Sequence, residues 1–152
     1  MHFELPLWDG DLREVIISDF SRQTQIMARY RMNDLVRLGP DCPCGMPQRV
    51  LAEVVGRADD CFDLPGGMVT PDILRNAVVD ADRRITDFRV RQTGPDRVEV
   101  LIPKGCDAHA VGAAVDAVLQ RKGISADVMV AHADLAPDMS RKLRRVEKVW
   151  RG

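Results

Sequence analysis

The sequence predicts an α+β fold in two parts, and three observations predict it. The first 55 residues alternate apolar and polar side chains and leave no room for a helix of ordinary length. A junction rich in glycine and proline follows at residues 56–71. Beyond this junction, helical and strand periodicities succeed one another, which predicts a mixed second part.

The N-terminal part is predicted to be mainly β. Residues 1–12 contain the turn signal Asp9-Gly10 and are expected to form an irregular lead-in. A loop is expected at residues 39–45, which contain two prolines and two glycines. The predicted strands cover residues 13–19, 25–38 and 49–55, the second one broken near Asn33.

The C-terminal part is predicted to follow the order βαββαβ, a ferredoxin-like arrangement with both helices on one face of a small antiparallel sheet. Pro71 after Thr70 is a helix start, and Gly123 is a typical helix stop. The tail from Leu135 onward is expected to be a loop and then a basic segment. The predicted helices cover residues 71–81 and 107–122, and the strands cover 61–64, 85–92, 97–102 and 126–131.

Composition excludes several classes of function. The net charge of -1 provides no field that would attract nucleic acid, and 5% aromatic residues argue against a base-stacking surface. No stretch approaches the roughly 20 apolar residues that span a bilayer. The N-terminus lacks the pattern of a secretory signal, so a cytoplasmic protein with reduced thiols is expected.

The junction carries a motif. Gly56-Arg57, the carboxylates Asp59 and Asp60, and then Gly66 resemble the hinge motif of adenylate-forming enzymes, most closely the phenylacetate-CoA ligase-like branch. The resemblance implies that Arg57 contacts the nucleotide and that the C-terminal domain pivots at Asp59 and Asp60. It also implies that Gly66 lets the backbone line a pantetheine channel, because glycine permits close approach. Taken alone, the paired carboxylates could equally form a simple turn.

A second motif lies in the predicted strand before the loop. Arg29 to Leu35 resembles the tyrosine-arginine-x-x-aspartate-leucine motif of the same family, with Asn33 where glycine is frequent. The resemblance implies that Tyr30 and Asp34 bind the nucleotide, with Asp34 accepting hydrogen bonds from both ribose hydroxyls. The alternative is an aspartate that merely ends a strand.

A third motif lies near the C-terminus. Ser140-Arg141-Lys142 resembles the family's short loop whose lysine reaches the acyl carboxylate and the α-phosphate. The resemblance implies that Lys142 is catalytic, since an ammonium can stabilise charge developing on a phosphoryl group. A solvated basic tail is the alternative.

The resemblance as a whole implies a fragment. Residues 1–58 would be the β-rich closing part of a large adenylation domain, and residues 59–152 the small mobile C-terminal domain. The complete enzyme would use ATP with Mg²⁺ to form an acyl-AMP and then transfer the acyl group to CoA or a carrier thiol. The phosphate-binding loop and the acyl pocket do not occur in this sequence, so a missing N-terminal adenylation domain is the expected partner and the chain alone is expected to be inactive.

Two questions stay open from the sequence. Cys42 and Cys44 could supply half of a zinc site shared with other residues, or belong to a structural loop. The whole chain could instead be a stand-alone ferredoxin-like module that binds a small molecule or mediates assembly. Such a module would bind a ligand or dimerise without any need for Arg57 and Asp59.

Overall fold

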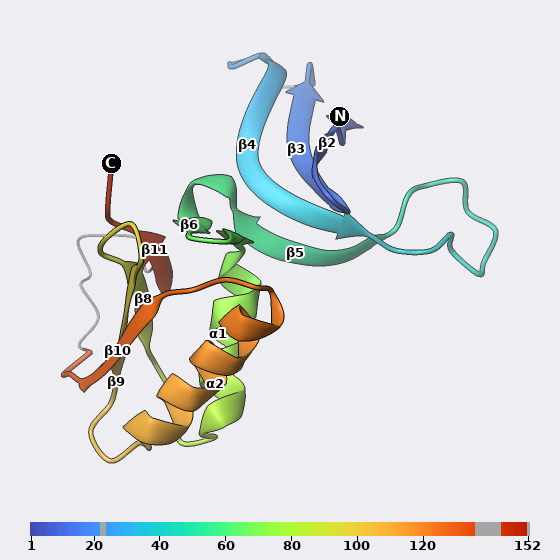
Figure 1. The fold of residues 1–152 in the computed structure, drawn as a ribbon. Helices are drawn as coiled ribbons and strands as arrows, with labels where there is room; N and C mark the ends of the chain where they lie inside the picture. The colour runs from blue at the N-terminus through green and yellow to red at the C-terminus, as the bar shows by residue number, and fades with distance from the viewer. Residues whose placement is uncertain (22–23, 136–143, 152) are drawn as a thin grey trace. The chain divides into compact units, whose positions relative to one another are not determined.

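The protein divides into two compact units, Met1–Asp59 and Asp60–Gly152. The structure is a computed structural model that describes residues 1–21, 24–135 and 144–151 (Figure 1). Helices and strands are both present, which confirms the predicted α+β class. Neither helix in the described ranges has the length and apolar character needed to cross a membrane.

The first unit is one antiparallel sheet with the strand order β1-β3-β4-β5, in which β2 also pairs with β3. The three long strands were predicted, whereas the two short ones fall in the segment expected to be irregular. They escape a periodicity search because a strand of three residues carries no repeat. The strands are β1 (His2–Glu4), β2 (Leu7–Asp9), β3 (Leu12–Asp19), β4 (Met27–Leu38) and β5 (Leu51–Arg57).

Strand β4 bulges against β3 at two places, between Arg31 and Leu35 and between Met27 and Tyr30. Ile16 and Glu14 of β3 are two residues apart, but their partners Arg31 and Leu35 on β4 are four apart, so β4 carries two extra residues. Asn33, inside this bulge, has φ +63°. Asparagine is one of the few residues other than glycine that adopt this left-handed conformation readily. The predicted break near Asn33 is therefore a bulge within a continuous strand, which bends where the extra residues are inserted.

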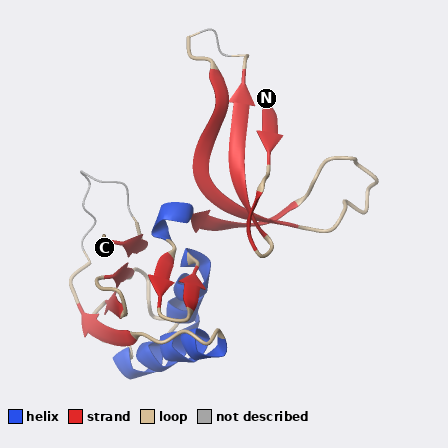
Figure 2. Ribbon diagram, turned by 45° about the horizontal axis from the view of Figure 1, so that its top comes forward, coloured by secondary structure: helices blue, strands red, loops and turns tan. Residues whose placement is uncertain are grey.

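The second unit has two helices on one face of a four-stranded sheet ordered β10-β9-β8-β11 (Figures 1 and 2). β8 and β9 are antiparallel, and the outer strands run parallel to their neighbours. The unit contains β6 (Phe62–Leu64), β7 (Gly67–Val69), α1 (Pro71–Ala81), β8 (Arg89–Gln92), β9 (Arg97–Ile102), α2 (Ala108–Arg121), β10 (Asp127–His132) and β11 (Val146–Lys148).

Local sequence explains both helices. Pro71 occupies the first turn of α1, where its missing N–H is not needed. The Asp107 side chain caps α2 by accepting a hydrogen bond from the Ala110 amide. Gly123, with φ +70°, ends α2 in the conformation that glycine adopts most easily. Both predicted helices are present within one or two residues of their expected bounds.

The sheet differs from the predicted ferredoxin-like one in two strands, because β6 is absent from it and β11 is added. The prediction of an antiparallel sheet was also wrong, since β10 and β11 each run parallel to their neighbour and the sheet is mixed. In a split βαβ arrangement, β6 would lie between β9 and β10. Here β10 pairs directly with β9, and β6 instead forms a separate two-stranded hairpin with β7. The fourth place in the sheet is taken by β11, from the segment predicted to be a basic tail.

Gln92 explains how the hairpin attaches without joining the sheet. Its side chain is fully buried at the end of β8. The amide nitrogen donates to the carbonyl of Asp63 at 2.6 Å and to that of Gly94 at 3.1 Å. Its amide oxygen accepts from the Asp63 N–H at 3.2 Å. The side chain thus satisfies both backbone groups of Asp63, as a neighbouring strand would.

Each unit has apolar residues at its centre. In the first unit the buried set lies on β3, β4 and β5: Leu12, Val15, Ile16, Ile17, Leu35, Val36 and Val55. In the second unit, the largest fully buried apolar side chains come from the hairpin, both helices and the sheet: Phe62, Leu74, Ile102 and Leu119.

Candidate functional site

Asp34 lies on β4 directly opposite Arg57 of β5. Residues opposite each other in an antiparallel pair project from the same face, with Cβ atoms about 5 Å apart. The Asp34 side chain is half-buried. Within the described part of the chain its carboxylate makes no hydrogen bond or ion pair, so both oxygens are available to a ligand.

The strand register places Tyr30 on the same face as Asp34. Tyr30 is opposite Ile17, and Val36 is opposite Arg13. Ile17 and Arg13 are four residues apart on the regular strand β3 and therefore point to one face. Tyr30 and Val36 share that face, and Asp34, two residues from Val36, shares it as well.

The bulge in β4 leaves this arrangement intact because it inserts two residues, an even number. A one-residue bulge would have turned Tyr30 to the opposite face from Asp34. The structure therefore brings together three of the predicted nucleotide-binding residues, Tyr30, Asp34 and Arg57, on one face of the first unit's sheet. The Tyr30 ring is 57% exposed.

Arg57 is oriented by Asp59. The guanidinium donates from Nε to one carboxylate oxygen at 2.9 Å and from Nη2 to the other at 3.2 Å. Both side chains are accessible to solvent, and an exposed pair of this kind contributes about 0–1 kcal/mol. The pair fixes the direction of Arg57 without committing it strongly, since other anions can compete with the carboxylate.

The two adjacent carboxylates of the predicted hinge have different environments. They lie in the short 3-10 helix η1 (Ala58–Asp60), and the division between the units falls between them. Asp59 is exposed and pairs with Arg57 in the first unit. Asp60 is buried and accepts a hydrogen bond at 3.0 Å from Arg144 in the second unit. The Arg57–Asp59 pair lies within the first unit, and the Arg144–Asp60 pair lies within the second.

The backbone at position 66 requires glycine. It is in the two-residue turn Pro65-Gly66 between β6 and β7, with φ +102°, as a type II turn demands at that position. A Cβ there would lie 2.3 Å from the carbonyl oxygen of Gly123. The Ser125 N–H also donates to the Pro65 carbonyl at 2.9 Å. Packing within the second unit therefore accounts for this glycine, and its role beside a pantetheine channel stays a prediction.

Lys142 lies outside the described residues. Described residues 144–151 pair with the rest of the second unit through Arg144, Arg145 and Lys148. Besides Arg144–Asp60, Arg145 Nε donates to Asp87 at 2.9 Å and Lys148 Nζ donates to Asp63 at 2.6 Å. Burial raises the pKa of Asp87, but hydrogen bonds from Arg145 and Arg89 outweigh it and leave the pKa below its usual value.

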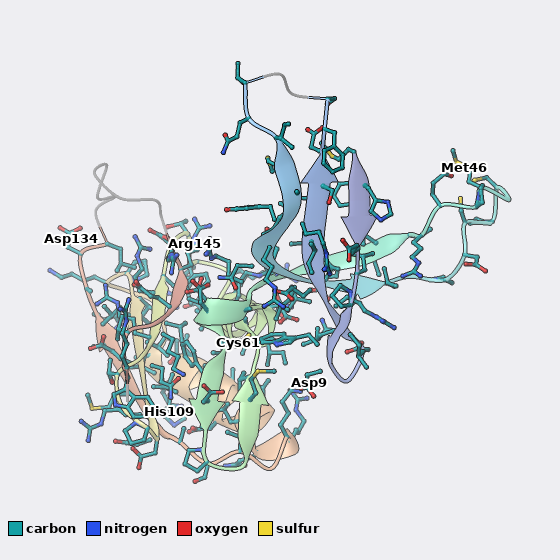
Figure 3. All side chains as sticks on the ribbon, turned by 90° about the horizontal axis from the view of Figure 1, so that it is seen from above. Asp9, Met46, Cys61, His109, Asp134 and Arg145 are labelled. Carbon is teal, nitrogen blue, oxygen red and sulfur yellow. The ribbon has the colours of Figure 1, made fainter. Side chains whose placement is uncertain are left out.

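Cys42 and Cys44 lie in the loop between β4 and β5, with Cys44 exposed and Cys42 half-buried. Figure 3 shows this loop, labelled at Met46, extending beyond the strands of the first unit. Among the described residues, no group of three or more histidine, cysteine, aspartate or glutamate side chains is placed to hold a metal ion. A zinc site would need ligands from elsewhere, and it stays a prediction.

A groove of 810 Å³ lies between the two helices of the second unit, lined partly by the alanines Ala77, Ala81, Ala114 and Ala117. Small side chains leave this space open. None of the predicted site residues lines it.

Sequence reasoning missed two interactions that shape the site region. The Asp60–Arg144 pair joins residues 84 positions apart, and the Gln92 contacts with Asp63 span 29. Neither separation leaves a local pattern. A polar residue at an inward position of an alternating strand was the available signal for Gln92.

Comparisons with known proteins agree with the predicted resemblance. No family model matches the chain. Over 71 residues it is 34% identical to phenylacetate-coenzyme A ligase of Pseudomonas putida, a match that covers 47% of this chain and 16% of that protein.

Solved structures share the fold. A 2-hydroxyisobutyryl-CoA ligase in the postadenylation state, in complex with 2-HIB-AMP, superposes with a TM-score of 0.63 at 21% identity. An open conformation of that ligase with 2-HIB-AMP and CoA gives 0.51. The matches cover 96% and 95% of this chain and 35% of each ligase chain. The chain thus spans about a third of the solved ligase and resembles the C-terminal portion of an adenylate-forming CoA ligase.

Proposed function

We propose that this chain is the C-terminal part of an adenylate-forming aryl- or acyl-CoA ligase-like enzyme. The complete enzyme would react a carboxylate with ATP and Mg²⁺ to give an acyl-AMP and pyrophosphate. It would then transfer the acyl group to CoA or a carrier thiol and release AMP. This proposal concerns the larger protein, because the chain covers only a minor part of the ligases that it resembles.

The observation that carries the proposal is the common face of Tyr30, Asp34 and Arg57. The Asp34 carboxylate, which has no hydrogen-bond partner among the described residues, can accept hydrogen bonds from both hydroxyls of a ribose. An arginine on the adjacent strand supplies a positive charge for the nucleotide's phosphate. The exposed Tyr30 ring adds an apolar surface beside them. One nucleoside monophosphate can use all three groups.

The second element of the proposal is a pivot at Asp59 and Asp60, between residues 1–58 of the large domain and residues 59–152 of the small one. In the structure Asp59 forms an exposed ion pair with Arg57, whereas Asp60 is buried. An exposed ion pair contributes little to stability, so this pair would oppose a backbone rotation near Asp59 only weakly. Such a rotation would let the small domain serve adenylation and thioester formation in turn, with Lys142 as the adenylation lysine and Gly66 beside the pantetheine.

The surface of the first unit fits a missing N-terminal adenylation domain as its partner. Many exposed large apolar side chains on one small unit favour an interface on that unit. Most of the exposed large apolar side chains among the described residues belong to this unit: Met1, Phe3, Leu7, Trp8, Phe20, Ile26, Tyr30, Met32, Met46, Leu51 and Val54. With that partner absent, the chain alone would not catalyse the reaction.

A domain exchange tests the proposal. This chain would replace the corresponding segment of the Pseudomonas putida phenylacetate-CoA ligase, and phenylacetate-dependent ATP–pyrophosphate exchange would be measured. The isolated chain is expected to give no exchange, and the chimera to restore it. Asp34→Ala in the chimera should reduce exchange by roughly 10–100-fold, the value of hydrogen bonds to a charged group.

Asp41→Ala is the matched control, because Asp41 is an exposed carboxylate of the same unit in the loop after β4. It should leave exchange unchanged. A folded chimera whose activity is equally insensitive to both substitutions would argue against a ribose role for Asp34. A chain that bound small molecules or dimerised by itself, regardless of Arg57 and Asp59, would favour a stand-alone module instead.

A further inference from the structure

The C-terminal segment 144–148 is held by ion pairs as well as by strand pairing. Strand β11 lies beside β8 in parallel register (Figure 1). The Val90 N–H also donates to the Arg145 carbonyl at 2.7 Å. Three basic side chains of the segment pair with carboxylates from three other places in the second unit: Arg144 with Asp60, Arg145 with Asp87, and Lys148 with Asp63. The segment predicted to be a basic tail is therefore fixed at several points.

The Arg144–Asp60 pair differs from the other two in the burial of its carboxylate. The Asp60 side chain is 8% exposed, against 24% for Asp87 and 68% for Asp63. A buried carboxylate has lost its hydration and needs hydrogen bonds from the protein. Arg144 Nη1 supplies one at 3.0 Å. Neutralising either partner should therefore loosen the segment more than neutralising the exposed Asp63.

The same pair links the junction to the C-terminal segment. Asp60 is the first residue of the second unit and directly follows the exposed Asp59. Both partners of the Arg144–Asp60 pair belong to the second unit, so a rotation near Asp59 would leave the pair intact. Arg144 follows Lys142 by two positions in the sequence. Because two residues of chain span at most about 7 Å, the point at which Arg144 is held limits the reach of position 142.

We infer that Asp60 is a positioning residue for adenylation, which acts on Lys142 by holding Arg144. The inference rests on the proposed function, because Lys142 has a task only if the complete protein forms an acyl-AMP. An ammonium that stabilises developing charge must be placed accurately, and a displacement of about 1 Å can cost roughly 100-fold in rate. The two adjacent carboxylates then have separate tasks, with Asp59 at the pivot and Asp60 holding the C-terminal segment.

The first test uses the isolated chain and hydrogen exchange. Asp60→Asn removes the charge and nearly keeps the shape of the side chain. It should accelerate exchange of the Val90 amide, which donates to Arg145, by roughly tenfold or more. The Thr93 amide, which donates to the Arg97 carbonyl at 3.0 Å, is the internal reference and should keep its rate. An unchanged rate at Val90 would overturn the inference, whatever the larger protein does.

The second test uses the chimera with the phenylacetate-CoA ligase and measures the two half-reactions separately. Adenylation is followed by ATP–pyrophosphate exchange, and thioester formation is started from added phenylacetyl-AMP and CoA. Asp60→Asn and Arg144→Gln should each lower the kcat of exchange by roughly 10–100-fold, with the KM for ATP within about twofold and thioester formation unchanged. The double variant should lose no more than the weaker single variant, because the two side chains make one contact. Arg144→Lys, which keeps the charge, should recover part of the loss.

Asp63→Asn is the matched control, because Asp63 is an exposed carboxylate that pairs with the same segment at Lys148. It should leave both half-reactions unchanged. An equal loss of both half-reactions in Asp60→Asn would indicate a purely structural role and overturn the inference. Lys142→Ala distinguishes the two levels of failure. If it leaves adenylation unchanged, the proposed function is wrong, whereas a loss in Lys142→Ala without a loss in Asp60→Asn contradicts the inference alone.

Discussion

Gln92→Leu is predicted to lower the free energy of unfolding of the second unit by removing the hydrogen bonds of one buried side chain. The Gln92 side chain is fully buried and makes three hydrogen bonds, two with the backbone of Asp63 and one with the carbonyl of Gly94. Leucine has a similar volume, so little cavity forms. The loss is therefore mainly that of the hydrogen bonds, at about 1 kcal/mol each, or about 3 kcal/mol in total.

The assay is urea unfolding followed by tryptophan fluorescence. The chain has two tryptophans, so Trp8→Phe leaves Trp150 as the reporter of the second unit. The backbone N–H of Trp150 donates to the backbone carbonyl of Gln92 at 2.9 Å, so the reporter residue lies next to the site. With a urea dependence of about 1.5–3 kcal/mol/M, the midpoint should fall by about 1–2 M.

Gln120→Leu is the matched control, because Gln120 is an exposed glutamine of α2 in the same unit. It should shift the free energy of unfolding by less than about 0.5 kcal/mol. Hydrogen exchange at the Asp63 amide should also accelerate in Gln92→Leu. Equal, small effects of both substitutions would refute the view that Gln92 joins the hairpin to the sheet.

Two further predictions concern the second unit. Gly66→Ala should lower the free energy of unfolding by clearly more than Gly105→Ala. Both glycines have positive φ, so both substitutions cost about 1–2 kcal/mol of backbone strain, but only a Cβ at position 66 meets the Gly123 carbonyl. Equal losses of stability in urea unfolding would contradict this clash. Hydrogen bonds from the Arg84 side chain and amide hold the pKa of Asp82 well below its usual range. Its carboxylate therefore stabilises the fold above pH about 4, and this contribution is lost as pH falls through the lowered pKa. The gap in stability between the unmodified chain and Asp82→Asn should be full at pH 7 and shrink below pH 4, whereas a gap constant with pH would exclude this linkage.

The long elements were predictable because their side chains repeat. Both helices and the strands β3, β4, β5, β9 and β10 carry enough residues to show an apolar period. Strands of three residues, such as β7 and β11, do not. The pairing of β11 with β8 depends on contacts across more than 50 residues of sequence, which no local pattern records.

The candidate site was predictable in its residues but not in its geometry. The motif around Asp34 predicted Tyr30 as a nucleotide-binding residue, and the junction motif predicted Arg57. Only the strand register, with its bulge of two extra residues around Asn33, shows that Tyr30, Asp34 and Arg57 share one face of the sheet. The sequence could not separate Asp59 from Asp60 either, since Arg144, which donates a hydrogen bond to Asp60, lies 84 residues away.

The central claim is that Asp34 binds ribose hydroxyls, and a coupling measurement tests it most directly. In the chimera, the kcat/KM of adenylation would be compared for ATP and 2′-deoxy-ATP, with Asp34 and with Asp34→Ala. Removing the hydroxyl should reduce kcat/KM by roughly tenfold or more when Asp34 is present. It should have almost no effect in Asp34→Ala, because the acceptor is already gone. The same loss in both proteins would contradict the account.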